Sequence, residues 1–231
     1  MTEPVWRRYS MREIFNMDGP VFRFLSRLAD LMLLNVIFII CSLPIITIGA
    51  SVTAMSYVSL KMKDDEGYVV RSFFKSFKQN FKQSTLIWLL MLFLALVLGL
   101  DTYILRQLGG SVYSVMQVIV YIGMVLWAMI FVYVFPIQAR FYNTIRGTLR
   151  NAVLLSIGNM PRTLCMVVVT VGSGIITFLT VDTLVYGMLI WILVGFALVS
   201  YCNCSLLYSV FKKLIEASEE SGAEVTEDTA V

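Results

Sequence analysis

Long apolar stretches alternate with short basic segments along the chain, which has 231 residues. A helix that spans the hydrocarbon core of a membrane needs about 20 mostly apolar residues. Four stretches meet this requirement: 85–105, 112–135, 164–180 and 183–210. A further stretch, 31–60, has no charged residue in 30 positions, which is long for one crossing and short for two. The pattern therefore predicts a membrane protein with several transmembrane helices.

The basic residues predict how these stretches are oriented. Seventeen of the eighteen Lys and Arg residues fall in four clusters, at 7–27, 61–82, 140–162 and 212–213. Basic residues beside membrane spans stay on the cytoplasmic side, so all four clusters are expected there. The chain between the first two clusters must then cross the membrane an even number of times. Pro44 supplies the break between two crossings, because proline ends a helix near the preceding residue.

We therefore expect an all-α, polytopic membrane helix bundle of about six transmembrane helices, with both termini cytoplasmic. The expected helices are about 21–43, 50–63, 84–106, 112–136, 163–181 and 183–211, all in one transmembrane domain over 1–215. The second helix is short, so the turn from Pro44 to Gly49 should dip into the outer leaflet. Small residues after the turn, among them Ala50 and Ser51, permit the close packing that buried backbone needs. A five-span alternative would leave one basic cluster outside.

Small residues in two later spans predict further close helix contacts. Ala95 and Gly99 are four residues apart in the third expected helix, and Gly172, Ser173 and Gly174 give the fifth a narrow face. Helices in lipid approach each other where small residues line the contact. Both faces are therefore expected to contact other helices rather than lipid.

The two longer connections expected on the cytoplasmic side are amphipathic. In each, apolar residues recur at steps of three and four, as on one face of a helix, and basic residues fill the other face. The first has apolar Val70, Phe73, Phe74, Phe77 and Phe81 with basic Arg71, Lys75, Lys78 and Lys82; the second has Phe141, Ile145, Leu149, Ala152 and Val153 with Arg140, Arg146 and Arg150. Such helices lie in the membrane interface. They either anchor the chain to the anionic cytoplasmic leaflet or bind a partner protein.

The composition leaves no room for a separate soluble domain. Hydrophobic residues make up 58% of the chain and charged residues 14%, against roughly 25% charged in soluble proteins. Acidic residues crowd the end of the chain, so 216–231 is expected to be a disordered acidic tail. The remaining body is basic, which suits an anionic leaflet. Nucleic-acid binding is not expected, because the basic residues lie between spans.

Residues for catalysis or metal binding are scarce. The chain has no histidine, and Cys41, Cys165, Cys202 and Cys204 all lie in apolar stretches. Cys202 and Cys204 lack the second ligand pair of a zinc site. An enzyme needs a general acid or base, a nucleophile or a metal. We therefore expect no catalytic site, no metal and no cofactor.

Four polar residues fall in or beside the expected spans: Asp30, Asn35, Gln117 and Asn203. Transporters place such groups near the bilayer midplane to bind solutes or ions. Amide side chains also form hydrogen bonds between helices without any transport role. The sequence leaves both interpretations open.

Several segments together resemble the YesL-like family of bacterial integral membrane proteins. They are 17–20 (MDGP), 24–25 (FL), 27–30 (RLAD), 41–51 (CSLPIITIGAS), 65–68 (DEGY) and 71–81 (RSFFKSFKQNF), followed by Asn151, Asn159, Pro161 and Arg162. The family has no established biochemical activity. Its members are often encoded beside sugar-importing ABC transporters and carbohydrate-degrading enzymes, mostly in Gram-positive bacteria. The resemblance implies a multi-pass protein of the bacterial cell membrane.

Together, these observations lead to two functional hypotheses. The first is a non-enzymatic accessory or regulatory partner of a bacterial carbohydrate ABC importer, which would bind the permease subunits through its amphipathic segments. The second is a small secondary transporter or permease that uses the intramembrane polar residues.

Overall fold

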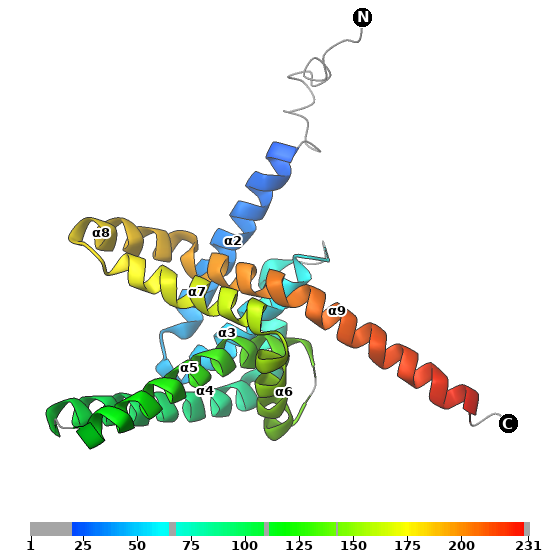
Figure 1. The fold of residues 1–231 in the computed structure, drawn as a ribbon. Helices are drawn as coiled ribbons and strands as arrows, with labels where there is room; N and C mark the ends of the chain where they lie inside the picture. Colours follow the sequence, from blue (N-terminus) through cyan, green and yellow to red (C-terminus); the bar gives the residue numbers. More distant parts are fainter. Residues whose placement is uncertain (1–19, 65–67, 109–110, 142, 229–231) are drawn as a thin grey trace, which may run out of the picture.

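The computed structural model describes residues 20–64, 68–108, 111–141 and 143–228. These residues form helices joined by short connections, and no strand occurs among them (Figure 1). The elements are α2 (Pro20–Ser42), the 3₁₀ turn η2 (Ile45–Thr47), α3 (Ile48–Lys61), α4 (Val69–Leu108), α5 (Ser111–Arg140), α6 (Ile145–Gly158), α7 (Met160–Thr177), α8 (Val181–Ile190), the π-helical segment η3 (Trp191–Gly195) and α9 (Phe196–Asp228). The expected all-α architecture is confirmed.

Five helices in the described part of the chain are long and apolar enough to cross a membrane. They are Val21–Ser42, Val69–Gln107, Tyr113–Arg140, Met160–Thr177 and Val181–Ala217. α3 has 14 residues, which cover about 21 Å at 1.5 Å per residue. That length falls short of the hydrocarbon core, which is about 30 Å thick. The polytopic membrane bundle is thus confirmed, with α3 as a shorter helix inside it.

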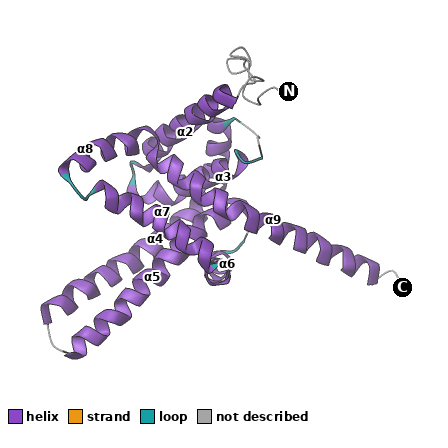
Figure 2. Cartoon of the chain, turned by 45° about the horizontal axis from the view of Figure 1, so that its top comes forward, coloured by secondary structure: helices purple, strands orange, loops and turns teal. Residues whose placement is uncertain are grey.

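Two helical hairpins diverge from the centre of the molecule (Figures 1 and 2). α4 pairs with α5 and α7 pairs with α8. Both hairpin tips lie on the side opposite the C-terminal end of α9. α3 lies where the hairpins meet and packs against α2, α4, α5 and α9. α6 lies across the bundle at the end away from the hairpin tips, where it packs against α5.

Basic residues from separate clusters meet at the end of the bundle away from the hairpin tips. The Arg27 guanidinium donates a hydrogen bond to the Tyr201 hydroxyl at 2.9 Å. The Lys63 ammonium lies 4.4 Å from the centre of the same ring. Asp64, which follows α3, lies 3.8 Å from Arg140 at the end of α5. α2 and α3 thus return the chain to one end, but α3 is shorter than the five candidate spans, so the expected count of six transmembrane helices stays a prediction.

α3 forms the buried centre of the fold. Ten of its residues are buried: Gly49, Ala50, Ser51, Thr53, Ala54, Met55, Ser56, Val58, Ser59 and Leu60. A side-chain carbon at Gly49 would collide with the Ser84 carbonyl and with the Trp88 side chain of α4. The Thr53 hydroxyl donates to the Ser84 hydroxyl at 2.9 Å. The small residues after Pro44 therefore permit the expected close packing, although Gly49 lies within α3 rather than in the turn.

The first amphipathic connection is not a separate interfacial helix. We expected one before a span that starts near residue 84, but α4 runs without interruption from Val69 to Leu108. No glycine or proline occurs between Val69 and Gly99, so nothing ends the helix there. The second amphipathic connection does form its own helix, α6.

The final span also differs from the expectation, at two places. A single helix was expected over 183–211, but the π-helical segment η3 separates α8 from α9. The tail from 216 was expected to be disordered, but α9 continues to Asp228. Glu, Ala and Lys are good helix formers, and Lys212 lies 3.8 Å from Glu216 one turn later.

The close contacts expected at Gly99 and Gly174 do not occur. A side-chain carbon at Gly99 or Gly174 would meet no neighbouring atom within 4 Å. One at Gly187 of α8 would lie 2.8 Å from the Thr177 side chain of α7. The close approach within this hairpin therefore uses a glycine that the spacing rule did not select.

Gly49→Ala should destabilise the protein, because the added methyl group meets backbone of α4. Overpacking of this kind costs about 1–3 kcal/mol. Thermal unfolding in detergent measures the loss. Gly99→Ala is the matched control and should leave the midpoint unchanged or slightly raised, since that position is open. Equal midpoints for the two variants would contradict the close approach of α3 to α4.

Single-cysteine labelling tests how the bundle is oriented. In a cysteine-free background, an impermeant thiol reagent should label Asp182→Cys in intact cells, because position 182 follows the α7–α8 tip. It should not label Lys63→Cys or Arg146→Cys until the membrane is opened. External labelling at position 63 would overturn the return of α3 to the inner side.

Candidate functional site

The first turns of α4 carry most of the residues predicted to form a partner surface. Phe73 is completely buried and packs with Leu34, Phe38 and Val58 from α2 and α3. The rings of Phe73 and Phe77 are stacked 6.1 Å apart. Phe81 follows Phe77 at 5.4 Å, and both are half-buried.

The predicted aromatic face therefore packs largely against other helices of the same protein. The spacing of three and four residues led us to expect a face that lies in the membrane interface, whereas Phe73 is buried inside the protein and Phe74 is exposed. The structure assigns that face chiefly to contacts with α2 and α3. Phe73 and Phe77 consequently fix the position of α4 and are not available as a docking surface.

The opposite face of the same segment is exposed and combines apolar and basic side chains. Tyr68 is 83% exposed and Phe74 is 42% exposed, and Arg71, Lys75 and Lys78 are exposed beside them. We call these five residues the α4 surface.

A groove of about 440 Å³ between α2 and α4 adjoins the α4 surface. It is lined by Asp30, Leu33, Tyr68, Val69, Val70, Arg71 and Phe74. The structure thus brings Asp30, which the sequence suggested only as an intramembrane polar residue, to the same groove as Arg71 and Phe74.

The second predicted basic segment lies on α6. Arg146 and Arg150 are exposed, while Thr148, Ala152 and Ser156 are buried on the other side of the helix. The side chain of Thr144 caps the start of α6 by accepting a hydrogen bond from the backbone of Gly147 at 3.2 Å. α6 is thus an amphipathic helix with its charges outward, as predicted.

Buried polar groups connect α6 to α4 through α5. The Thr148 hydroxyl donates to Gln138 at 2.9 Å, and the Gln138 amide donates to Asn80 at 3.3 Å. Gln83 donates to the backbone carbonyl of Asn143 at 2.6 Å. Sequence reasoning missed this network. The sequence feature that could have predicted the network is a set of polar residues within apolar helix faces. Thr148, between Ile145 and Ala152, is one of them.

Asn35 is the most heavily bonded of the predicted intramembrane residues, and it is completely buried. Its amide nitrogen donates to the carbonyls of Trp191 at 3.0 Å and Ile192 at 2.8 Å. Its amide oxygen accepts from the backbone N–H of Ala197 at 3.0 Å. A π-helical segment departs from the α-helical pairing of backbone groups, and Asn35 binds the first two carbonyls of η3 and an N–H at the start of α9. We call these three bonds the Asn35 clamp.

The other two amides lie elsewhere. Gln117 donates to the Tyr121 hydroxyl at 2.8 Å within α5. Asn203 of α9 donates to the Thr170 hydroxyl of α7 at 2.8 Å. Asn35, Gln117 and Asn203 thus have different partners and do not form a common cluster. Within the described residues, no group of three or more His, Cys, Asp or Glu side chains could hold a metal.

Part of the chain matches the model of a protein family. The profile of a family described as "Protein of unknown function, DUF624" matches residues 31–102. No curated protein and no solved structure matches the chain. The matched region covers the second half of α2, all of α3 and most of α4. It includes Asn35, the buried α3 and the α4 surface.

Asn35→Ala should destabilise the protein, because it removes one buried and two part-buried hydrogen bonds to backbone groups. An unsatisfied buried polar group costs about 1–3 kcal/mol. Thermal unfolding in detergent should show a clear drop. Gln117→Ala removes an amide of the same kind that bonds only a side chain, and it should be mild. Similar midpoints for the two variants would show that η3 does not need the clamp.

Proposed function

We propose that the protein is a non-enzymatic accessory or regulatory subunit of the bacterial cell membrane that binds the permease subunits of a carbohydrate ABC importer. The observation that carries this proposal is the α4 surface, where exposed aromatic and basic residues stand beside a groove. The resemblance to the YesL-like family supports the choice of partner, since its members are often encoded beside sugar importers.

The length of α4 favours a surface at the membrane boundary. Its 40 residues extend about 60 Å at 1.5 Å per residue, twice the thickness of the hydrocarbon core. The basic first turns therefore extend past the apolar part, at the end where Arg27, Lys63 and Arg140 also lie. That end is cytoplasmic by the positive-inside rule.

The chemistry of the α4 surface suits a protein partner with acidic groups. Aromatic residues and Arg are enriched in protein interfaces, and Phe74 and Tyr68 expose rings next to Arg71 and Lys75. The surface is also rigid, because Phe73 on the other side of the helix is completely buried. A rigid surface loses little conformational entropy on binding.

A small secondary transporter is the second candidate. One observation favours it: Asn203 lines a cavity of about 300 Å³ among the spans. Two observations count against it: Asn35 forms its hydrogen bonds with backbone groups, and Gln117 donates to Tyr121. The three amides therefore do not line a common path.

Replacing Arg71, Lys75 and Lys78 by Gln together should greatly reduce recovery of the importer permease with tagged protein from native membranes. Each charge near an anionic or acidic surface contributes about 1 kcal/mol. Lys212→Gln with Lys213→Gln, on α9, is the control and should not change recovery. Membrane fractionation shows whether each variant is inserted normally.

Two results would overturn the accessory function. One is equal recovery of the permease with the triple variant and with wild type. The other is solute flux by the purified protein alone in liposomes, which would favour the transporter.

A further inference from the structure

The outward face of α6 combines basic and apolar side chains. Arg146 and Arg150 are exposed. Three apolar residues share the face with them: Val153 is 36% exposed, Leu154 57% and Ile157 55%. At 3.6 residues per turn, the five side chains fall within an arc of about 100°. The face therefore differs from the solvated face of a surface helix, which is mostly polar.

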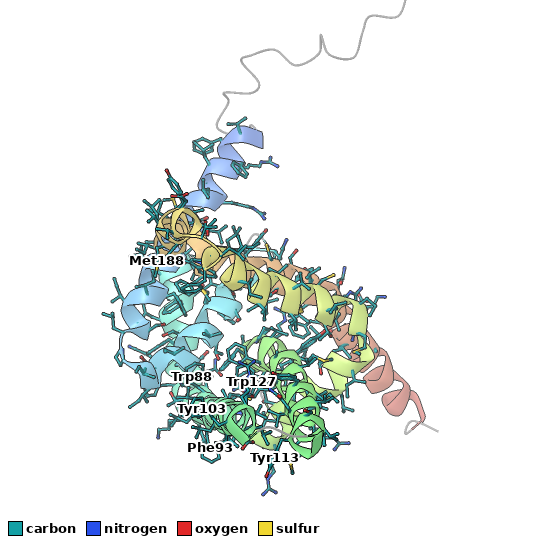
Figure 3. All side chains as sticks on the ribbon, turned by 60° about the vertical axis from the view of Figure 1, so that its left-hand side comes forward. Trp88, Phe93, Tyr103, Tyr113, Trp127 and Met188 are labelled. Carbon is teal, nitrogen blue, oxygen red and sulfur yellow. The ribbon has the colours of Figure 1, made fainter. Side chains whose placement is uncertain are left out.

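The start of α6 lies at the level where the apolar part of α4 begins. Lys82 is exposed, and no charged residue lies between it and Asp101. The neighbouring Gln83 donates to the backbone carbonyl of Asn143, just before α6, at 2.6 Å. Beyond Lys82, α4 exposes apolar side chains, and Figure 3 shows Phe93 on the side of the α4–α5 hairpin away from the other helices. The start of α6 is therefore at the inner boundary of the hydrocarbon core.

The end of α6 lies at the same boundary, because α7 begins directly after it. The Thr163 hydroxyl of α7 donates to the backbone carbonyl of Ser156 at 2.7 Å. The exposed apolar residues of α6 are followed in α7 by Leu164, which is 66% exposed, and Val168, which is 60% exposed. Since α7 is one of the candidate spans, these two side chains face lipid. α6 thus lies along the boundary, with both ends at the same depth.

Polar contacts on the inner face of α6 hold the helix in this orientation. The Thr148 hydroxyl donates to Gln138 of α5 at 2.9 Å. The Thr163 hydroxyl, bonded to Ser156, also lies 3.0 Å from the Tyr133 hydroxyl of α5. Thr148 and Ser156 are buried. The opposite face, with its arginines and apolar residues, is therefore held outward.

Arg146 and Arg150 have no acidic neighbours in the sequence. No Asp or Glu occurs in 102–181, and no ion pair to either arginine occurs among the described residues. Residues four apart on a helix are neighbours, so the two guanidinium groups can share one anion. Arg binds phosphate through two parallel N–H···O bonds. The phosphate of a lipid headgroup thus supplies a counter-charge that this segment does not.

We propose that α6 is an interfacial helix that binds an anionic phospholipid of the inner leaflet. Arg146 and Arg150 bind the headgroup phosphate, and Val153, Leu154 and Ile157 insert beside the acyl chains. A helix in the membrane interface buries apolar residues at the acyl boundary and attracts anionic lipids with its basic ones. The site is separate from the α4 surface and does not depend on the importer as a partner.

A lipid fits this face better than a soluble protein does. Leu154 and Ile157 lie at the depth where the exposed side chains of α7 already contact lipid, so lipid removes them from water without any further protein. The α4 surface differs in this respect, because it lies on the turns of α4 before Lys82, past the boundary.

Lipid titration tests the headgroup site. The purified full chain in detergent is titrated with dioleoylphosphatidylglycerol or dioleoylphosphatidylcholine, and native mass spectrometry measures the Kd of the first bound lipid. Wild type should bind the anionic lipid more tightly. Arg146→Gln with Arg150→Gln should weaken its binding about 30-fold, as the loss of two charges near an anionic surface would give.

The matched control is Arg71→Gln with Lys75→Gln, which removes two charges from the α4 surface. It should leave the Kd for phosphatidylglycerol unchanged. An unchanged Kd in the α6 variant, or equal weakening in both variants, would overturn the site on α6. Gel filtration establishes that each variant is folded.

Fluorescence quenching tests the insertion of the apolar residues. In a cysteine-free background, a fluorophore on Leu154→Cys is measured in liposomes that contain phosphatidylglycerol. A phospholipid brominated along its acyl chains should quench it, and iodide in the water should not. A fluorophore on Lys75→Cys should show the opposite pattern. Quenching at position 154 by iodide alone would overturn the insertion and would instead indicate a face open to a soluble partner.

Discussion

The Asn35 clamp is the interaction on which the arrangement of the spans depends. Within hydrocarbon, backbone polar groups must find their partners inside the protein. Asn35 binds two carbonyls of η3 and one N–H of α9, so the change from α8 to α9 is hydrogen-bonded to α2. The same bonds hold α2 against the last span, although the two are far apart in sequence. One amide therefore permits an irregular helix and joins the two ends of the bundle.

α3 has the complementary role at the centre. Its small residues let α4 approach until Gly49 touches the backbone at Ser84. Its larger residues, such as Val58, pack with Phe73 of α4. Because one side of α4 is held in this way, the other side presents Phe74 and the basic residues in a fixed geometry. The candidate docking surface is therefore a consequence of internal packing as much as of charge.

The cavity and the α4 surface share one short helix. Met55 of α3 lines the cavity and also belongs to the apolar cluster that contains Phe73. The two hairpins diverge around α3 (Figure 1).

The sequence by itself determined the membrane class, the approximate spans and the break at Pro44, because apolar length and basic flanks act locally and are strong. It also placed Phe73 on the apolar face of an amphipathic helix. Only the tertiary structure decided that α2 and α3 cover that face, that Asn35 bonds to η3, and that Gly49 rather than Gly99 makes a close contact. A periodic pattern indicates that one face of a helix is apolar, but it does not identify the helices or lipids that this face contacts. Partners far apart in sequence, such as Asn35 and Trp191, are chosen by packing of the whole bundle.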